Sequence, residues 1–163
     1  DVVVVGGGDS ALQEAAVLAH YARTVHLVHR GTAFRARAAV REVFDRAFAG
    51  RPQSLNVHWQ TTVAGIEGAQ GVERIALTDA HGARCVIEAR AIYPCIGLEP
   101  NSAWTGLACD ACGAILTEPG LSTSMPRVLA AGAVRAGFGG RLLDAERDGQ
   151  AAARSALAVA GAR

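Results

Sequence analysis

The apolar positions near the start of the chain change their spacing within twenty residues. Val2–Val5 is a run of four valines, typical of a strand buried on both faces in a parallel sheet. Small and apolar residues then recur at helical spacing over 12–19. A second apolar run at 24–30 predicts another strand, and apolar residues three and four apart predict an amphipathic helix over 36–48. This alternation of strand and helix indicates an α/β fold.

Three glycines join the first strand to the first helix, with the spacing Gly6-x-Gly8-x-x-Ala11 of a dinucleotide-binding turn. Gly6 permits the tight turn, Gly8 lets the backbone approach a pyrophosphate, and Ala11 is small enough for the helix to pack against the strand. The free amides of the first helical turn then face the phosphates. The alternative is a tight turn without a ligand, but the flanking strand and helix favour a binding site.

The remaining pattern predicts mostly strands. A strand at 55–59 is followed by three strands separated by turn residues, at 62–66, 72–78 and 84–89. We interpret these three as an antiparallel meander beside a doubly wound, Rossmann-like parallel sheet. Three further strands are expected at 91–97, 115–117 and 128–132, and a last long helix runs from Arg141 to about residue 160.

The end of the second strand is basic where a dinucleotide fold selects its ribose. His29 and Arg30 stand there, followed by Gly31 and then by Arg35 and Arg37. An acid at this point would favour NAD, whereas arginine matches the 2′-phosphate of NADP with its planar fork. The cluster therefore favours NADPH, and the alternative is a loop of an arginine-rich chain that happens to be basic.

Composition excludes several kinds of function. The 163 residues are 50% hydrophobic and carry a net charge of +1, so we expect neither a nucleic-acid nor a membrane partner. The sixteen basic residues are all arginine, which excludes lysine Schiff-base chemistry and a Walker phosphate loop. No apolar run approaches the roughly 20 residues of a membrane span, and we expect a cytoplasmic location. The chain begins inside a core strand without Met, so we expect a fragment.

Other polar residues offer weaker candidates. Cys109 and Cys112 form a Cys-x-x-Cys, which can be a redox pair, half of a zinc site, or small residues in a turn. Gly113 follows instead of a helix, which favours the turn. Asp144 and Asp148 share one face of the last helix, where we expect solvent. We predict neither a catalytic side chain nor a metal ligand, and we expect structural roles for the histidines at 20, 26 and 58 and packing roles for the tryptophans at 59 and 104.

Several short motifs occur in an order that resembles the thioredoxin reductase-like branch of the two-dinucleotide flavoprotein reductases. They are Val5–Ala11, His26–Arg30 with Phe34–Ala36, Cys95–Gly97 with Pro100 and Asn101, and Thr123–Pro126 with Val128–Gly132. The resemblance implies an NAD(P)H-binding lobe at 1–92 and, at 93–163, the C-terminal segment of an FAD-binding lobe.

The resemblance also implies two sets of cofactor-binding residues. Those expected to bind NADP(H), with the last three holding its 2′-phosphate, are Gly6, Gly7, Gly8, Asp9, Ser10, His29, Arg30 and Arg35. Those expected near FAD are Gly97, Gly132, Ala133, Arg141 and Leu142, of which the last two open a helix beside the isoalloxazine ring.

Two departures from the family pattern qualify this expectation. Gly31 replaces a second arginine, which weakens selectivity for NADPH, and Ala133 replaces an aspartate that bonds the flavin's ribityl chain. Losing one such bond costs roughly 1–3 kcal/mol. The family's first FAD fingerprint and its redox Cys-x-x-Cys would both lie before Asp1, so the 163 residues should not form a complete flavin site.

The sequence thus predicts the NADPH-binding portion of a flavoprotein oxidoreductase. Hydride would pass from NADPH to FAD and on to an unidentified acceptor, with a disulfide as one candidate. The alternative is a degenerate or split NADP(H)-binding module without flavin turnover. Expected partners are the small dinucleotides, together with a second copy in a homodimer or the missing FAD-binding half.

Overall fold

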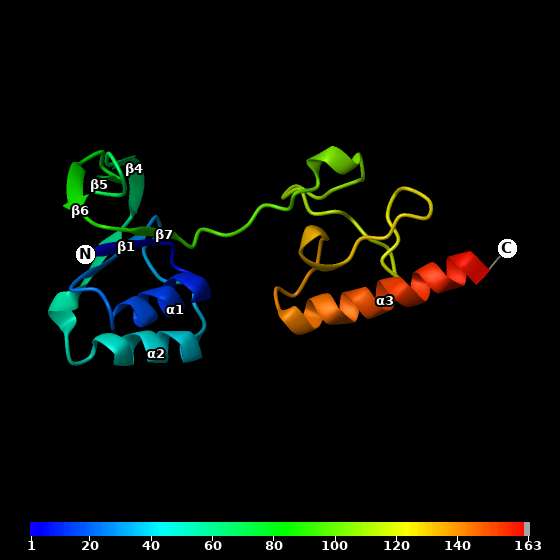
Figure 1. Cartoon of the computed structure of the whole chain (residues 1–163), viewed down its shortest axis with the longest axis horizontal. Helices are drawn as coiled ribbons and strands as arrows, with labels where there is room; N and C mark the ends of the chain where they lie inside the picture. The colour runs from blue at the N-terminus through cyan, green and yellow to red at the C-terminus, as the bar shows by residue number, and fades with distance from the viewer. Residues whose placement is uncertain (162–163) are drawn as a thin grey trace. The chain divides into compact units, whose positions relative to one another are not determined.

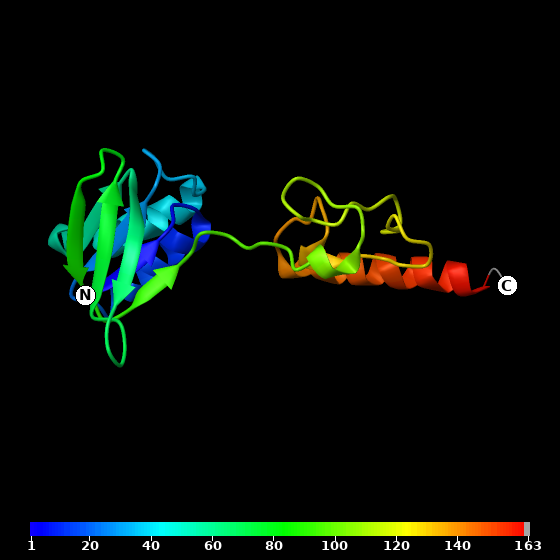
Figure 2. The same ribbon diagram turned by 90° about the horizontal axis from the view of Figure 1, so that it is seen from above.

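The chain folds into two compact units, of which the first is Asp1–Gly97 and the second begins at Leu98. They are seen in a computed structural model that describes residues 1–161, coloured blue to green and green to red respectively in Figures 1 and 2. Among residues 1–161, no helix combines the length and apolar character needed to cross a membrane.

A four-stranded parallel sheet lies at the centre of the first unit, in the order β3-β2-β1-β7. Its strands are β1 (Val2–Val5), β2 (Val25–His29), β3 (Leu55–Trp59) and β7 (Ile92–Pro94). The central strand β1 pairs Val4 with Leu27 of β2 and with Tyr93 of β7. Pro94 lies in an edge strand, where its missing N–H is tolerated.

Different elements cover the two faces of this sheet, as Figure 1 shows. Helices α1 (Asp9–Leu18) and α2 (Ala38–Phe48) pack on one face, where the core includes Val4 and Leu27. The antiparallel sheet β4-β5-β6 packs on the other, against Val3 and Val28. Its strands are β4 (Thr61–Glu67), β5 (Arg74–Asp79) and β6 (Arg84–Glu88). Alternate valines of β1 thus enter opposite cores, and the predicted α/β fold with its meander is confirmed.

The second unit contains one long helix and irregular chain. Helix α3 (Leu142–Gly161) agrees with the predicted last helix, and two short 3-10 helices precede it, η2 (Ala103–Thr105) and η3 (Gly132–Val134). A further 3-10 helix, η1 (Pro52–Ser54), belongs to the first unit.

The strands predicted at 115–117 and 128–132 are wrong. Ile115 forms single bridges with Cys109 and Arg135, and Leu129 forms one with Ser122. A strand is stabilised by a continuous row of cross-strand neighbours. Among the described residues of the second unit, only one residue of each segment forms a bridge, so neither segment forms a continuous strand.

His26 and His58 form a stacked pair on neighbouring strands β2 and β3. Their ring centroids lie 5.4 Å apart, and Nδ1 of His26 is 3.1 Å from Nε2 of His58. A hydrogen bond between two imidazoles requires one to accept, so at least one must be neutral. Burial lowers the pKa of both rings below the ordinary 6.5, and the nearby His26 lowers the pKa of His58 further.

We predict that the folded chain loses stability as the pH falls below about 6.5. The unfolded chain protonates these histidines near their ordinary pKa of 6.5, whereas the folded chain, with both pKa values lowered, does so at lower pH, and the proton uptake favours unfolding. The urea midpoint should drop between pH 7.5 and pH 5.5, values that bracket the ordinary histidine range of about 6.5. His58→Gln should reduce this drop, while His20→Gln at an exposed position should not. Equal drops in both variants would contradict the assignment.

Candidate functional site

The glycine turn is fitted closely against the ends of three parallel strands. Gly6 has φ +144°, and its amide donates to the carbonyl of Val28 at 2.9 Å. A Cβ at this position would collide with the carbonyl oxygen of Cys95 and would lie 3.1 Å from Cβ of Ala11. Gly6 therefore permits the tight turn, and the fully buried Ala11 packs closely beside it, as their spacing predicts.

His29 lies beneath both the glycine turn and the basic loop. Its side chain is buried, and its Nε2 is 3.1 Å from the carbonyl oxygen of Ala33. A Cβ at Gly7 would collide with the imidazole, and a Cβ at Gly31 would lie 2.8 Å from Nε2. A side chain at position 31 would therefore require the end of the His29 ring to shift.

Gly8 begins helix α1 and differs from the two glycines before it. It is the N-cap residue, with φ −96°, and no atom lies within 4 Å of a Cβ built on it. Ser10 follows, exposed, in the first helical turn. The open space at Gly8 and the first-turn amides give this helix end the features of a phosphate site.

Asp9 has a partner that sequence reasoning missed. Its carboxylate accepts the backbone amide of Arg37 at 2.8 Å and forms an ion pair with Nε of the same residue at 2.5 Å. These contacts, the backbone bond above all, lower the pKa of Asp9. The side chain therefore fastens the basic loop to helix α1, and no pattern of spacing announces a bond between positions so far apart.

The basic loop and the glycine turn share one cavity within the first unit. The amide of Arg35 donates to the carbonyl of Gly7 at 2.7 Å, which fixes the loop on the turn. The cavity has a volume of about 350 Å³ and lies at the carboxyl ends of the sheet strands. It is lined by Val5, Gly6, Gly7, Val28, His29, Arg30, Arg35, Thr61, Thr62, Val63, Cys95 and Ile96. The structure thus brings together five of the predicted NADP(H) residues, while Gly8, Asp9 and Ser10 continue from the turn into α1.

The residues predicted near FAD are placed less tightly. Gly132, with φ +78°, and the exposed Ala133 lie in η3, and Ala133 lines an open groove of about 590 Å³ in the second unit. The other lining residues are Leu98, Glu99, Pro100, Asn101, Val134, Phe138 and Gly140. Arg141 and Leu142 are exposed at the start of α3, and Gly97 ends the first unit with φ +107°.

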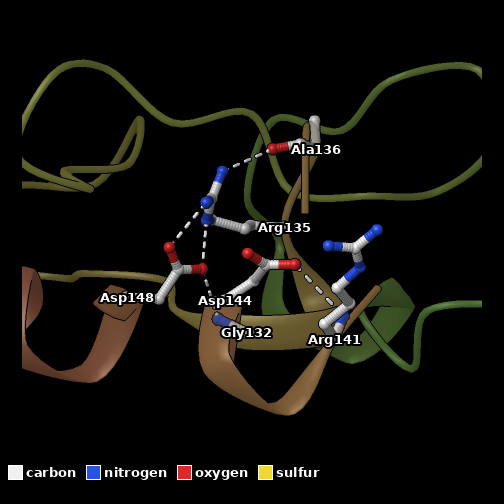
Figure 3. Close-up of polar contacts among 6 residues, drawn as sticks. All are labelled: Gly132, Arg135, Ala136, Arg141, Asp144 and Asp148. Atoms are coloured by element: carbon white, nitrogen blue, oxygen red, sulfur yellow. Dashed lines mark hydrogen bonds and ion pairs between the residues drawn. The ribbon is translucent and has the colours of Figure 1, made fainter. Parts of the chain in front are cut away.

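Asp148 is a buried acid of the second unit, and the prediction that it faces solvent is wrong. Its side chain is 9% exposed and forms an ion pair with Arg135. Figure 3 shows one carboxylate oxygen shared by the Arg135 guanidinium and the Gly132 amide. Hydrogen bonds from Arg135 are the main cause that lowers the pKa of Asp148. Asp144, one helical turn earlier, accepts the amide of Arg141 at 3.2 Å.

Cys112 lies in a turn and Cys109 lies beside it, paired with Ile115, which agrees with the turn interpretation. The carboxylate of Asp110 accepts the amides of Cys112 at 2.8 Å and of Ala114 at 2.9 Å, which closes the turn. Both thiols are free, and Cys112 is exposed. Within residues 1–161, no group of three His, Cys, Asp or Glu side chains is arranged to hold a metal ion.

The tryptophans differ from one another. Trp59 packs on Phe34, with ring centroids 4.5 Å apart, behind the basic loop. Trp104 is 79% exposed, so the packing role expected for it is wrong.

A parallel sheet whose central strand ends in a glycine turn, with arginines after the neighbouring strand, is typical of dinucleotide-binding α/β domains. The profile of the pyridine nucleotide-disulphide oxidoreductase family matches residues 1–158, and the chain belongs to this family. The resemblance stated from the sequence is therefore confirmed.

The similar proteins are thioredoxin reductases. That of Chlamydia pneumoniae is 35% identical over 139 residues, covering 83% of this chain and 43% of its own. That of Listeria monocytogenes is 32% identical over 162 residues, which cover 96% of this chain and 49% of the Listeria protein. The crystal structure of the Lactococcus lactis enzyme matches with a TM-score of 0.80 at 26% identity, covering 96% and 51%. The chain thus spans about half the length of these relatives.

We predict that Gly6→Ala lowers the free energy of unfolding by about 3 kcal/mol or more, because the new Cβ meets backbone at a strained φ. The matched variant Gly8→Ala meets open space at an N-cap and should cost about 1 kcal/mol. Urea unfolding of both variants measures the difference. Similar losses would show that the contact with Cys95 does not constrain the turn.

Proposed function

We propose that the first unit binds NADP(H) in the cavity between the glycine turn and the basic loop. The observation that carries this proposal is the shared lining of that cavity, where Gly6 and Gly7 lie opposite no acidic side chain and beside Arg30 and Arg35. A cofactor with phosphates at two separated positions suits such a site, because one end offers backbone amides and the other offers guanidinium groups.

The phosphate end fits a pyrophosphate. Gly6 and Gly7 lie so close to Cys95 and His29 that neither position has room for a side chain, and the backbone is left as the surface offered to a ligand. Gly8 is free on its outer side, which leaves the helix start open to a ligand. In this proposal the Gly8 backbone and the exposed Ser10 receive the phosphates, and Asp9 contributes by holding Arg37.

The 2′-phosphate is assigned to Arg30 and Arg35. Both are exposed at the cavity, and the bond from the Arg35 amide to the Gly7 carbonyl holds Arg35 next to the turn. His29 lines the same cavity, and its Nε2 is within hydrogen-bond distance of the Ala33 carbonyl oxygen. Arg30 and Arg35 are the two guanidinium groups that line this part of the cavity, while Gly31 contributes none.

The second unit is proposed to complete an FAD site whose remaining part lies in sequence outside this chain. Gly132 and Ala133 would face the ribityl and phosphate part, with Arg141 and Leu142 beside the ring system. The groove at Ala133 is lined largely by apolar side chains, which suits a flat aromatic group more than a phosphate. When bound, the two cofactors supply the redox chemistry, a hydride passing from nicotinamide C4 to flavin N5.

The parent protein is accordingly proposed to be an NAD(P)H- and FAD-dependent oxidoreductase. The similar proteins are named for reduction of thioredoxin, which makes a protein disulfide our proposed acceptor for the whole protein. One observation favours a second function, an NADP(H)-binding module without flavin turnover: Ala133 has no side-chain acceptor for the flavin.

We predict that Arg30→Ala weakens NADPH binding about tenfold or more and leaves NADH binding nearly unchanged, because only NADPH carries the 2′-phosphate. Calorimetric titration of the 163-residue chain with each cofactor measures both affinities. Arg84→Ala, at an exposed position of β6, removes the same charge away from the cavity and should change neither. An equal loss for both cofactors in Arg30→Ala would mean that this residue does not recognise the 2′-phosphate.

Flavin content distinguishes the two proposed functions. In the protein expressed from its complete reading frame, we expect flavin absorbance that NADPH bleaches under anaerobic conditions. A colourless protein that still binds NADPH would instead establish the module without turnover. Ala133→Asp should then raise affinity for added FAD, since it restores one acceptor.

A further inference from the structure

The Gly132–Val134 turn is held by helix α3. Oδ2 of Asp148 accepts the Gly132 amide at 2.9 Å, and it also accepts Nε of Arg135 at 2.5 Å. Oδ1 of the same carboxylate accepts Nη2 of Arg135 at 2.6 Å. One carboxylate therefore binds the first residue of the turn and the residue that follows it, as the dashed lines in Figure 3 show.

Each nitrogen of the Arg135 guanidinium donates one hydrogen bond in this cluster. Two of its nitrogens bond Asp148, and Nη1 donates to the carbonyl of Ala136 at 2.9 Å. Its side chain is 17% exposed. Arg135, which follows the turn, is the nearest basic residue, and its guanidinium pairs with Asp148.

The other side of the turn is fastened by backbone. The amide of Ile115 donates to the carbonyl of Val134 at 2.9 Å, and the amide of Ala136 donates to the carbonyl of Ile115 at 2.8 Å. Asp148 thus bonds the start of the turn, and Ile115 bonds its last residue and the chain just after it. What remains presented to the groove is Ala133 and Val134.

We propose that Asp148 is the positioning residue that sets the shape of the Gly132–Val134 turn for its ligand. The functional part of this inference rests on the proposed binding of FAD at the turn. Gly132 has φ +78°, and its amide direction is fixed by a carboxylate that is nearly removed from water. This anchor does not involve residue 133. Ala133, which stands where the family pattern has aspartate, therefore lacks one ligand contact but leaves the shape of the turn intact.

Other charges near the pair do not substitute for Asp148. Asp144 faces Arg135 from the preceding helical turn, but its carboxylate is engaged by the Arg141 amide and lies 4.0 Å from the guanidinium of Arg147. Removing the carboxylate of Asp148 would therefore leave the buried Arg135 without its main partner. An unpaired buried charge of this kind lowers stability strongly.

The test separates anchoring of the turn from simple stability of the ion pair. Asp148→Leu removes the carboxylate and strands Arg135, whereas Asp148→Leu with Arg135→Met removes both charges and replaces them by apolar groups of similar size. Such double replacements often restore stability. Glu146→Gln, an acid neutralised at an exposed position of the same helix, is the control.

Two readouts are measured. The first is hydrogen exchange of the Gly132 amide by NMR in the ligand-free 163-residue chain. The second is FAD affinity, measured by flavin fluorescence in the protein expressed from its complete reading frame. We expect both Asp148 variants to exchange the Gly132 amide about tenfold faster or more and to bind FAD about tenfold more weakly, even where the double variant regains its melting temperature. Glu146→Gln should change neither.

Unchanged exchange at Gly132 in the double variant would overturn the anchoring role, whatever the protein binds. Faster exchange with unchanged FAD affinity would overturn the positioning role. An unsubstituted protein that binds no FAD would overturn the flavin part of the proposed function and the ligand part of this inference, while exchange at Gly132 would still decide the anchoring.

Discussion

The approach of Gly6 to the carbonyl of Cys95 is the contact on which the ligand-binding edge of the first unit depends. It brings the end of β1 against β7, and the amide of Cys95 reinforces it by donating to Val5 at 2.7 Å. Ala11 packs on the same glycine, so helix α1 begins at a fixed place. The His29 ring, at the end of β2, lies directly against Gly7 and so limits how closely the turn can approach that strand. Turn, helix and basic loop are consequently one packed assembly.

Both units use the same device to fasten a loop to a helix. Asp9 on α1 accepts a backbone amide and a guanidinium from Arg37, and Asp148 on α3 accepts an amide from Gly132 and a guanidinium from Arg135. The two differ in burial. Solvent screens the first pair, so it contributes chiefly by directing the loop, whereas the second is nearly dry and is costly to break. A chain whose cations are all arginine suits this device, because the planar fork bonds a carboxylate at two points.

The sequence predicted those features that depend on local periodicity. The four valines predicted a strand buried on both faces, and Ala11 predicted close packing of the helix on the strand. Both features follow from the local spacing of apolar and small residues. Residues 115–117 and 128–132 are apolar enough for strands, but pairing depends on neighbours that local spacing cannot reveal. Asp148 was missed for a related reason, since its partners lie thirteen and sixteen positions away. His29 was recognised as part of the site, while its burial under Gly7 and Gly31 required the structure.

The position of β1 between β2 and β7 has a consequence for how the first unit is made. Val3 is paired on one side with His26 and on the other with Ile92. During synthesis on a ribosome, β1 can acquire its first neighbour early, but the second emerges after both helices and the whole meander. Until then the valine edge and the backbone of Gly6 stay uncovered. The edge of β1 that faces β7 can therefore complete its backbone pairs only after Ile92–Pro94 has been synthesised.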